Sequence, residues 1–178
     1  MRNDICGSNT PPEIKDLWQT PGYVFRALDK EFKFVADVAA NRNNTMCNVF
    51  IPEEQDTLIT PWNTVAKPGE YVWMNPPFSN PRPFLEKAAR EQQEEMIGCV
   101  MLLPADPSVG WFEFGCNTAN ECRLIIGGRL AFINAKTGKP GRINNKGSLF
   151  FIWHPGCHLD CFFTKVTRQQ LMLRGLEE

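Results

Sequence analysis

The sequence contains no apolar run that approaches the roughly 18 consecutive residues of a membrane-spanning helix. Residues 1–16, MRNDICGSNTPPEIKD, are polar and lack the apolar core of a secretory signal peptide. These two absences exclude an integral membrane protein and give no sign of export. We therefore expect a protein that works in the cytoplasm.

The cysteine pattern excludes a disulfide framework. The seven cysteines are an odd number, and most lie in apolar surroundings, which is typical of reduced, buried thiols. One segment, HPGCHLDC, does offer four side chains of zinc-binding type: His154, Cys157, His158 and Cys161. Their spacing matches no established zinc-finger pattern, in which the ligands come as two separated pairs. We expect no metal site, and a zinc site in this segment is the alternative.

No internal repeat or low-complexity segment divides the chain. Its 178 residues, with 43% hydrophobic and 22% charged side chains, have the size and composition of one soluble globular domain. Residues 1–16 contain two adjacent prolines and little periodicity, which indicates a loose N-terminal arm. Residues 17–178 are expected to form a single domain.

Hydrophobic periodicity predicts strands that alternate with helices. Helices are expected from Thr20 and Pro21 onward, with Thr20 as the N-cap, and over residues 83–93, around 109–114 and at the C-terminus. Strands are expected over residues 34–38, 47–51, 71–74, 97–105 and 161–166.

Two long β-rich runs, residues 123–134 and 147–155, flank a polar and basic segment. They predict an antiparallel hairpin with an extended tip at residues 135–146. A short helix could follow the turn at residues 39–45. The order of elements predicts an α/β fold, a three-layer sandwich with a mostly parallel sheet and an antiparallel C-terminal hairpin at its edge.

The segment NPPF follows the predicted strand 71–74, where ligand sites of open α/β sheets are found. Prolines restrict the backbone, so Asn75, Pro76 and Pro77 would hold the Asn75 side-chain oxygen and the Pro76 carbonyl as two fixed acceptors. Two such acceptors suit the two hydrogens of an exocyclic purine amine, and Phe78 offers a flat face for a base taken out of a duplex. A rigid proline turn is the alternative interpretation.

NPPF resembles the NPP[YFW] motif of S-adenosylmethionine-dependent amino-methyltransferases, and residues 16–153 resemble the phage-type DNA N6-adenine methyltransferase (Dam) family. The segments DLWQTP, FVADVAAN and EEQDTL match further family motifs in the expected order. The resemblance implies a Rossmann-like methyltransferase fold and an adenine-specific DNA methyltransferase. It also implies S-adenosyl-L-methionine as cofactor, double-stranded DNA as substrate and, for a phage-encoded protein, work in the host cytoplasm that could protect DNA from restriction.

The resemblance also assigns cofactor-binding residues. Thr20 and Pro21, with Trp18 beside them, would lie near the methionine part of the cofactor; Asp37 would meet its amino group and Asp56 its adenine. Taken alone, each aspartate is a common cap or turn residue.

The sequence departs from many methyltransferases after the first strand. Ala39 and Ala40 stand where a glycine-rich loop is usual, and no glycine occurs between Gly22 and Gly69. Alanine is small enough to let a ligand approach. For the ribose hydroxyls, Glu53 and Glu54 are both open candidates.

DNA is expected to meet the basic half of the chain. From residue 123 onward nine Lys and Arg stand against three acids, whereas residues 1–122 carry ten basic and seventeen acidic side chains. The predicted tip could contact phosphates through Lys136, Lys139, Arg142 and Lys146 and read base edges through Asn144 and Asn145. A solvated hairpin tip and chance clustering of charge are the simpler explanations.

Other functions stay open at this stage. N4-cytosine methyltransferases use a similar motif, usually with Ser before the prolines, and protein glutamine methyltransferases carry Tyr where this chain has Phe78. An inactive methyltransferase-like DNA-binding or anti-restriction protein is a further alternative. No motif indicates the oligomeric state, and either a monomer or a weak dimer is compatible with the sequence.

Overall fold

The computed structural model describes residues 18–134, 137–141 and 146–176. Its main sheet contains seven strands: β2 (Ala36–Ala40), β3 (Phe50–Pro52), β4 (Tyr71–Met74), β5 (Gly98–Ala105), β6 (Glu121–Ile126), β8 (Gly147–Trp153) and β9 (Phe162–Thr167). Two more, β1 (Trp18–Gln19) and β7 (Ile133–Asn134), form a small antiparallel sheet. The helices are α1 (Gly22–Phe32), α2 (Arg82–Glu95), α3 (Gly110–Thr118) and α4 (Arg168–Leu176), with short 3₁₀ turns η2 (Glu53–Gln55) and η3 (Trp62–Thr64).

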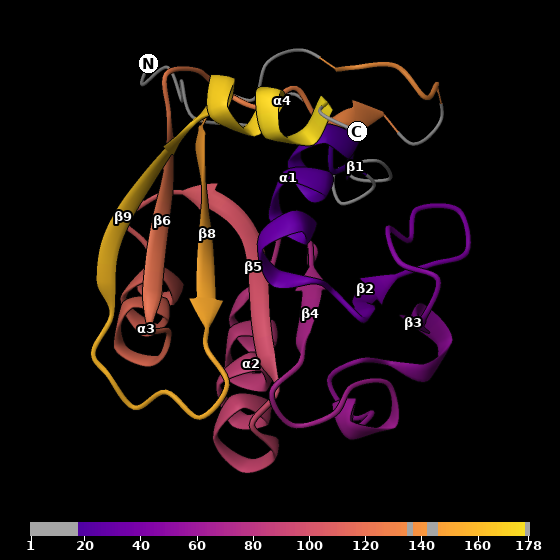
Figure 1. Ribbon diagram of the computed structural model, residues 1–178, viewed down its shortest axis with the longest axis vertical. Coiled ribbons are helices and arrows are strands. Elements are labelled where there is room, and N and C mark those ends of the chain that lie inside the picture. Colours follow the sequence, from indigo (N-terminus) through magenta and orange to yellow (C-terminus); the bar gives the residue numbers. More distant parts are fainter. Residues whose placement is uncertain (1–17, 135–136, 142–145, 177–178) are drawn as a thin grey trace, which may run out of the picture.

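The order of strands across the main sheet is β3-β2-β4-β5-β8-β6-β9, and helices cover both of its faces (Figure 1). Every neighbouring pair is parallel except the two pairs that β8 makes with β5 and β6. The α/β sandwich with a mostly parallel sheet is therefore confirmed.

Two hydrophobic cores result from the alternation of side chains along the strands. On one face Trp73, Val100 and Phe150 pack with α1 and α4, and on the other Met74, Met101 and Phe151 pack with α2. Long buried runs on β5 and β8 are expected for strands covered on both faces.

The N-terminal helix forms where apolar side chains recur at helical spacing, because Val24, Phe25, Leu28 and Phe32 are all buried. It begins after Pro21, which occupies the N-cap position, and no side chain caps it. The prediction of Thr20 as N-cap is therefore wrong.

The two ends of the described chain meet where α4 lies beside α1 (Figure 1). Gly175 on α4 contacts the backbone of α1 so closely that a Cβ there would lie 2.0 Å from the carbonyl oxygen of Tyr23. The Arg26 side chain of α1 donates to the Gly175 carbonyl at 2.7 Å. The C-terminal helix is thus fixed to the helix that follows β1.

The second helix extends slightly beyond the predicted residues 83–93. Its inner face buries Leu85 and Ala88 and also the ion pair between Lys87 and Glu91, whose N–O distance is 2.5 Å. Glu91 also accepts a hydrogen bond from the Trp62 amide at 3.2 Å. This link joins α2 to the segment that precedes β4.

Four local predictions need correction. Residues 123–134 do not form one strand, because β6 ends at Ile126 before Gly127 and Gly128, and β7 pairs with β1. The antiparallel strand β8 lies inside the sheet and not at its edge, which β9 forms. Residues 41–45 form a turn and no helix, and the strand expected over residues 47–51 is the shorter β3.

The segment HPGCHLDC forms a loop fixed by buried amides. Gln92 donates to the carbonyls of His154 and Cys157 at 3.0 and 2.8 Å, and Asn120 donates to that of Leu159 at 2.9 Å. Within the described ranges, no group of three or more His, Cys, Asp or Glu side chains could hold a metal ion, and the six described cysteines are free thiols. None of the described helices has the length and apolar character needed to cross a membrane.

Candidate active site

A cavity of about 270 Å³ lies at the carboxyl ends of β2 and β4. The chain leaves β2 towards β3 on one side and then returns to β4 on the other, so this is the point where the strand order reverses and where open α/β sheets bind ligands. Most residues predicted to bind the cofactor or to catalyse line this cavity: Trp18, Thr20, Asp37, Ala39, Asp56, Asn75 and Pro77.

The charged group at the base of the cavity is the carboxylate of Asp37, which is only 3% exposed. Its Oδ2 accepts a hydrogen bond from the Met46 amide at 3.0 Å, and its Oδ1 accepts one from the Ala39 amide at 3.3 Å. Burial nevertheless raises the pKa of Asp37 to about 6, against the lowering effect of these two bonds. A cationic ligand group would stabilise the ionised form.

The turn after β2 holds this carboxylate in place. Asn44 Oδ1 accepts from the Asn41 amide at 2.6 Å, and Asn41 Oδ1 accepts from the Asn43 amide at 2.9 Å. Such local side-chain bonds favour turns over helix. The turn brings the Met46 amide to Asp37, and Asn41, Asn44 and Met46 also line the cavity.

Two buried oxygens beside the cavity have no hydrogen-bond partner. The described residues contain four such buried side-chain atoms, and two of them, Thr20 Oγ1 and Asn75 Oδ1, belong to residues that line this cavity. The Asn75 amide nitrogen donates to the Trp18 carbonyl at 3.3 Å, which fixes the orientation of the side chain. A buried oxygen without a partner costs free energy, so both atoms indicate a polar ligand.

The cavity lining also contains the acidic side chains of Glu53 and Asp56. Asp56 ends η2 with a positive φ of 49°, and its Oδ1 accepts from the Leu58 amide at 3.0 Å. Glu53 lines the cavity, whereas Glu54 does not. Of the two glutamates considered for the ribose, the structure thus brings only Glu53 to the cavity.

Three predicted residues lie near the cavity without lining it. Pro21 and Pro76 are buried, and Phe78 is half-buried between the two cores. The Phe78 ring meets Phe132 edge to face, with 5.7 Å between ring centroids. This contact braces the aromatic ring that follows the prolines.

Comparison with known proteins matches residues 7–177 to the family model described as DNA N-6-adenine-methyltransferase (Dam). The DNA N-6-adenine-methyltransferase of Haemophilus phage HP1 (strain HP1c1) is 39% identical over 150 residues, which cover 83% of this chain and 84% of that protein. The protein of the same name from Escherichia phage T1 is 38% identical over 161 residues, which cover 82% of this chain and 66% of that protein. The chain belongs to the Dam family. No solved structure matches it significantly.

The segment predicted to meet DNA in this Dam-family chain lies only partly within the described residues. Lys136, Arg142, Asn144 and Asn145 are outside them. Lys139 is exposed, whereas Lys146 forms an ion pair with Asp106 at the end of β5. The hydrogen bond from Lys146, together with two from Ser108, lowers the pKa of Asp106 to about 2.

The same segment contacts the cavity wall through β1. Gly141 lies against Trp18, and a Cβ at this glycine would lie 2.3 Å from a ring carbon. The Gly141 amide donates to the Phe132 carbonyl at 2.8 Å. The basic segment is therefore linked both to Trp18 of the cavity and to the residue that braces Phe78.

Sequence reasoning missed several residues that line the cavity, among them Gln19, Asn44, Met46, Thr57 and Phe84. Gln19 lies within DLWQTP and Thr57 within EEQDTL, so these two motifs could have identified both residues. Asn44 and Met46 reach the cavity only because of the turn after β2, which periodicity does not reveal.

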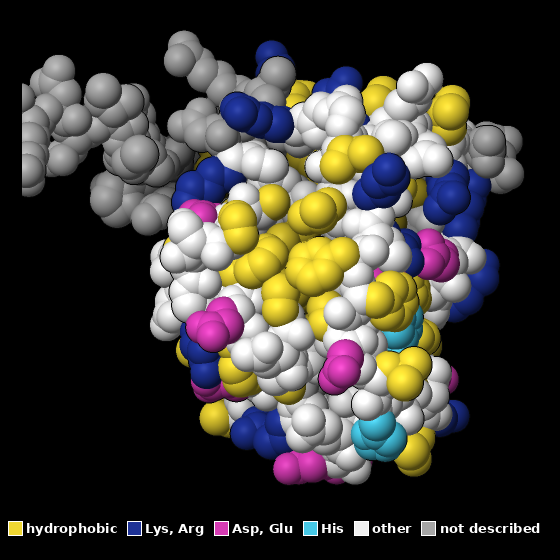
Figure 2. All heavy atoms as spheres, turned by 90° about the vertical axis from the view of Figure 1, so that its left-hand side faces the viewer, with side chains coloured by type: hydrophobic (Ala, Val, Ile, Leu, Met, Phe, Trp, Pro, Cys, Tyr) yellow, Lys and Arg dark blue, Asp and Glu magenta, His cyan; other side chains and the backbone are white. Residues whose placement is uncertain are grey.

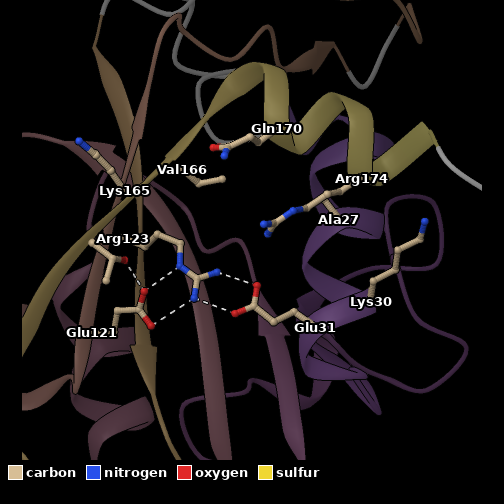
Figure 3. Close-up of a pocket in the computed structure, with 10 residues that line it drawn as sticks. Ala27, Lys30, Glu31, Glu121, Arg123, Lys165, Val166, Gln170 and Arg174 are labelled. Carbon is tan, nitrogen blue, oxygen red and sulfur yellow. Dashed lines mark hydrogen bonds and ion pairs between the residues drawn. The ribbon is translucent and has the colours of Figure 1, made fainter.

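A larger hollow of about 570 Å³ lies between α1, β6, β9 and α4 (Figure 3). The Arg123 guanidinium at its base already bonds Glu31 and Glu121 at 2.7–2.9 Å. In Figure 3 the Arg174 side chain points towards Arg123 and Glu31, whereas the side chains of Lys30 and Lys165 point away from them. We place the candidate active site at the smaller cavity, because Thr20 Oγ1 and Asn75 Oδ1 there are buried without a hydrogen-bond partner and the cavity lies at strand ends.

Proposed function

We propose that this protein transfers a methyl group from S-adenosyl-L-methionine to the N6 amino group of adenine in double-stranded DNA. Membership of the Dam family supports the reaction class. One observation supports the assignment of the site: a buried carboxylate and two unpartnered buried oxygens, from Asp37, Thr20 and Asn75, surround one cavity at the strand switch point.

The residues around the cavity fit this cofactor. The Asp37 carboxylate would pair with its ammonium group, and the Thr20 hydroxyl of the same cavity would bond the methionine part. The small side chains of Ala39 and Ala40 leave room for close approach, while Glu53 and Asp56 provide acceptors for the ribose and adenine. When bound, the cofactor supplies an electrophilic methyl group on a positively charged sulfur.

The target base would be held by the NPPF segment. Asn75 Oδ1 and the Pro76 carbonyl would accept the two hydrogens of the adenine amine, and Phe78, braced by Phe132, would stack on the base. No residue needs to act as a general base in this arrangement, because the methylated nitrogen would lose its extra proton to water during or after the transfer. Most of the acceleration comes from positioning the amine nitrogen and from fixed dipoles around it.

The wider arrangement follows from the same proposal. A single domain, residues 17–178, would bind the cofactor and the DNA, with Lys139 and the neighbouring basic residues at the phosphates. The reaction would take place in the cytoplasm of a phage-infected host and protect DNA from restriction.

The test is a methylation assay with labelled cofactor on unmethylated DNA, followed by sequencing for modified bases. We expect Asn75→Ala and Phe78→Ala to lose methyl transfer by at least roughly a hundredfold, because each removes a group that positions the base. Asn80→Ala is the matched control, since Asn80 is exposed in the same loop. The clamp assignment fails if either variant keeps near-normal activity, and methylcytosine in the product would identify an N4-cytosine enzyme instead.

A further inference from the structure

The outermost strand β9 exposes aromatic side chains on both faces of the sheet. Phe162 is 47% and Phe163 is 59% exposed, and Leu159 in the preceding loop is 72% exposed. Figure 2, which looks onto this edge, shows apolar side chains gathered in the middle of the surface. Exposed aromatics on an open edge strand are unusual, because such edges readily pair with another strand.

The backbone of β9 has a definite set of open hydrogen-bonding groups. The Phe162 amide donates to the Asn120 carbonyl at 3.0 Å, and the strand runs parallel to β6 without a register shift. Residues 162, 164 and 166 therefore direct their backbone groups to β6, and residues 163, 165 and 167 direct theirs outward. The Thr167 amide is already taken by Gln170 Oε1 at 2.8 Å. Among the described residues, the open outward amides of β9 are those of Phe163 and Lys165.

We propose that two copies of this chain associate by antiparallel pairing of their β9 strands, with the two-fold axis at Thr164. In this register Phe163 lies opposite Lys165 of the second copy, and Lys165 opposite Phe163 of the second copy. All the open amides of both strands then find carbonyl partners, since these are the residues that face outward.

The side-chain chemistry favours this register over one with the two-fold axis at Lys165. Each Lys165 ammonium lies beside an aromatic ring on the same face of the joined sheet, which favours a cation–π contact. On the other face Phe162 lies opposite Val166 of the second copy. A two-fold axis at Lys165 would instead place two ammonium groups opposite each other, which is unfavourable.

The pairing leaves the candidate active site accessible. The cavity lies at β2 and β4, and three strands, β5, β8 and β6, separate β4 from β9. The dimer would carry two separate active sites, and this inference does not depend on the proposed reaction.

Sedimentation equilibrium on the full chain tests the proposal. We expect the wild type to dimerise reversibly, and Phe163→Lys to weaken association by roughly tenfold or more, because it places like charges opposite Lys165 twice. The double variant Phe163→Lys with Lys165→Glu should restore association, since opposite charges then face each other. Ile59→Lys, at a site 76% exposed and away from β9, is the control and should behave like the wild type.

Several outcomes would overturn the proposal. If the wild type stays monomeric up to about 100 μM, the proposed dimer does not form. A dissociation constant above this concentration corresponds to a free energy of dimerisation weaker than about −5.5 kcal/mol. A dimer that Phe163→Lys leaves unchanged uses another surface. Loss of association that the double variant does not restore would refute the register. Circular dichroism melts of each variant separate misfolding from loss of contact.

Discussion

The buried position of Asp37 disfavours the ionised form of its carboxyl group unless a cationic group lies next to it. Its pKa is raised from 3.8 to about 6 by burial. A raised pKa in the folded state means that the stabilising contribution of this group is present at low pH and is lost as the pH rises through about 6. The cofactor-free protein therefore bears a cost at neutral pH, which an ammonium group next to the carboxylate would offset.

Cofactor affinity should depend on pH through this residue. Because only the ionised carboxylate attracts the ammonium group, affinity should fall roughly tenfold for each pH unit below 6 and level off above pH 7. Asp37→Asn should bind at least roughly tenfold more weakly at pH 7.5 and show little pH dependence between pH 5 and 7. Isothermal titration calorimetry measures both quantities.

The control for this prediction is Asp160→Asn, which changes an exposed aspartate and should leave the pH profile as in the wild type. A wild-type affinity that stays constant between pH 5 and 7 would show that the Asp37 carboxylate does not meet the ammonium group.

Single residues were predictable from the sequence where a short motif specifies them. NPPF and the strand before it located Asn75, and the family motif located Asp37. The family resemblance placed Thr20 near the cofactor, whereas the local pattern predicted a helix N-cap, because Thr before Pro is also a helix-cap pattern. Only the structure shows that its hydroxyl is buried without a hydrogen-bond partner and that Thr20 lines the same cavity as Asn75.

At the scale of elements, local sequence patterns predicted the positions of helices and strands better than they predicted which strands pair with each other. The buried runs of β4 and β5 and the helix α2 formed as periodicity predicted. The insertion of β8 between β5 and β6 was missed, because strand order depends on contacts between segments far apart in the sequence. Residues 123–134 were wrongly predicted to form one strand, because the two glycines in this run separate β6 from β7.

In the basic segment, Lys139 and Lys146 should contribute differently to the salt dependence of DNA binding. Lys139→Ala should reduce the slope of log affinity for DNA against log salt by about 1, as expected for one phosphate contact. Lys146→Ala should reduce it less, because Asp106 already neutralises that ammonium group. Fluorescence anisotropy at several salt concentrations provides the slopes.

Lys67→Ala is the matched control for the salt series, because this exposed lysine precedes β4 at the amino end of the strand, opposite the cavity. Equal reductions for Lys139→Ala and Lys146→Ala would mean that the ion pair with Asp106 opens when DNA binds. An unchanged slope for Lys139→Ala would place the phosphate contact elsewhere.

At the scale of the whole molecule, α4 packs on α1, the helix that follows Thr20 of the cavity lining. Gly175→Ala would place a methyl group against the Tyr23 carbonyl, so α4 must move away from α1. Overpacking of this kind costs about 1–3 kcal/mol, and each kcal/mol lowers the melting temperature of a chain this size by roughly 2–4 °C. Because Thr20 precedes α1, cofactor affinity should fall as well.

Thermal melts and calorimetric titration of the same variant check this prediction. Gly110→Ala is the control, since a Cβ there meets no atom within 4 Å. A Gly175→Ala protein that melts and binds like the wild type would show that α4 has no influence on the cavity.

The contact between α1 and α4 also has a consequence for how the protein is made. The strands β2 and β4 and the NPPF segment leave the ribosome long before α4, which contains the last described residues of the chain. The helix α1, which follows Thr20, gains its contact with α4 only after α4 has emerged. A nascent chain whose α4 is still inside the ribosome should therefore bind the cofactor more weakly than the folded chain.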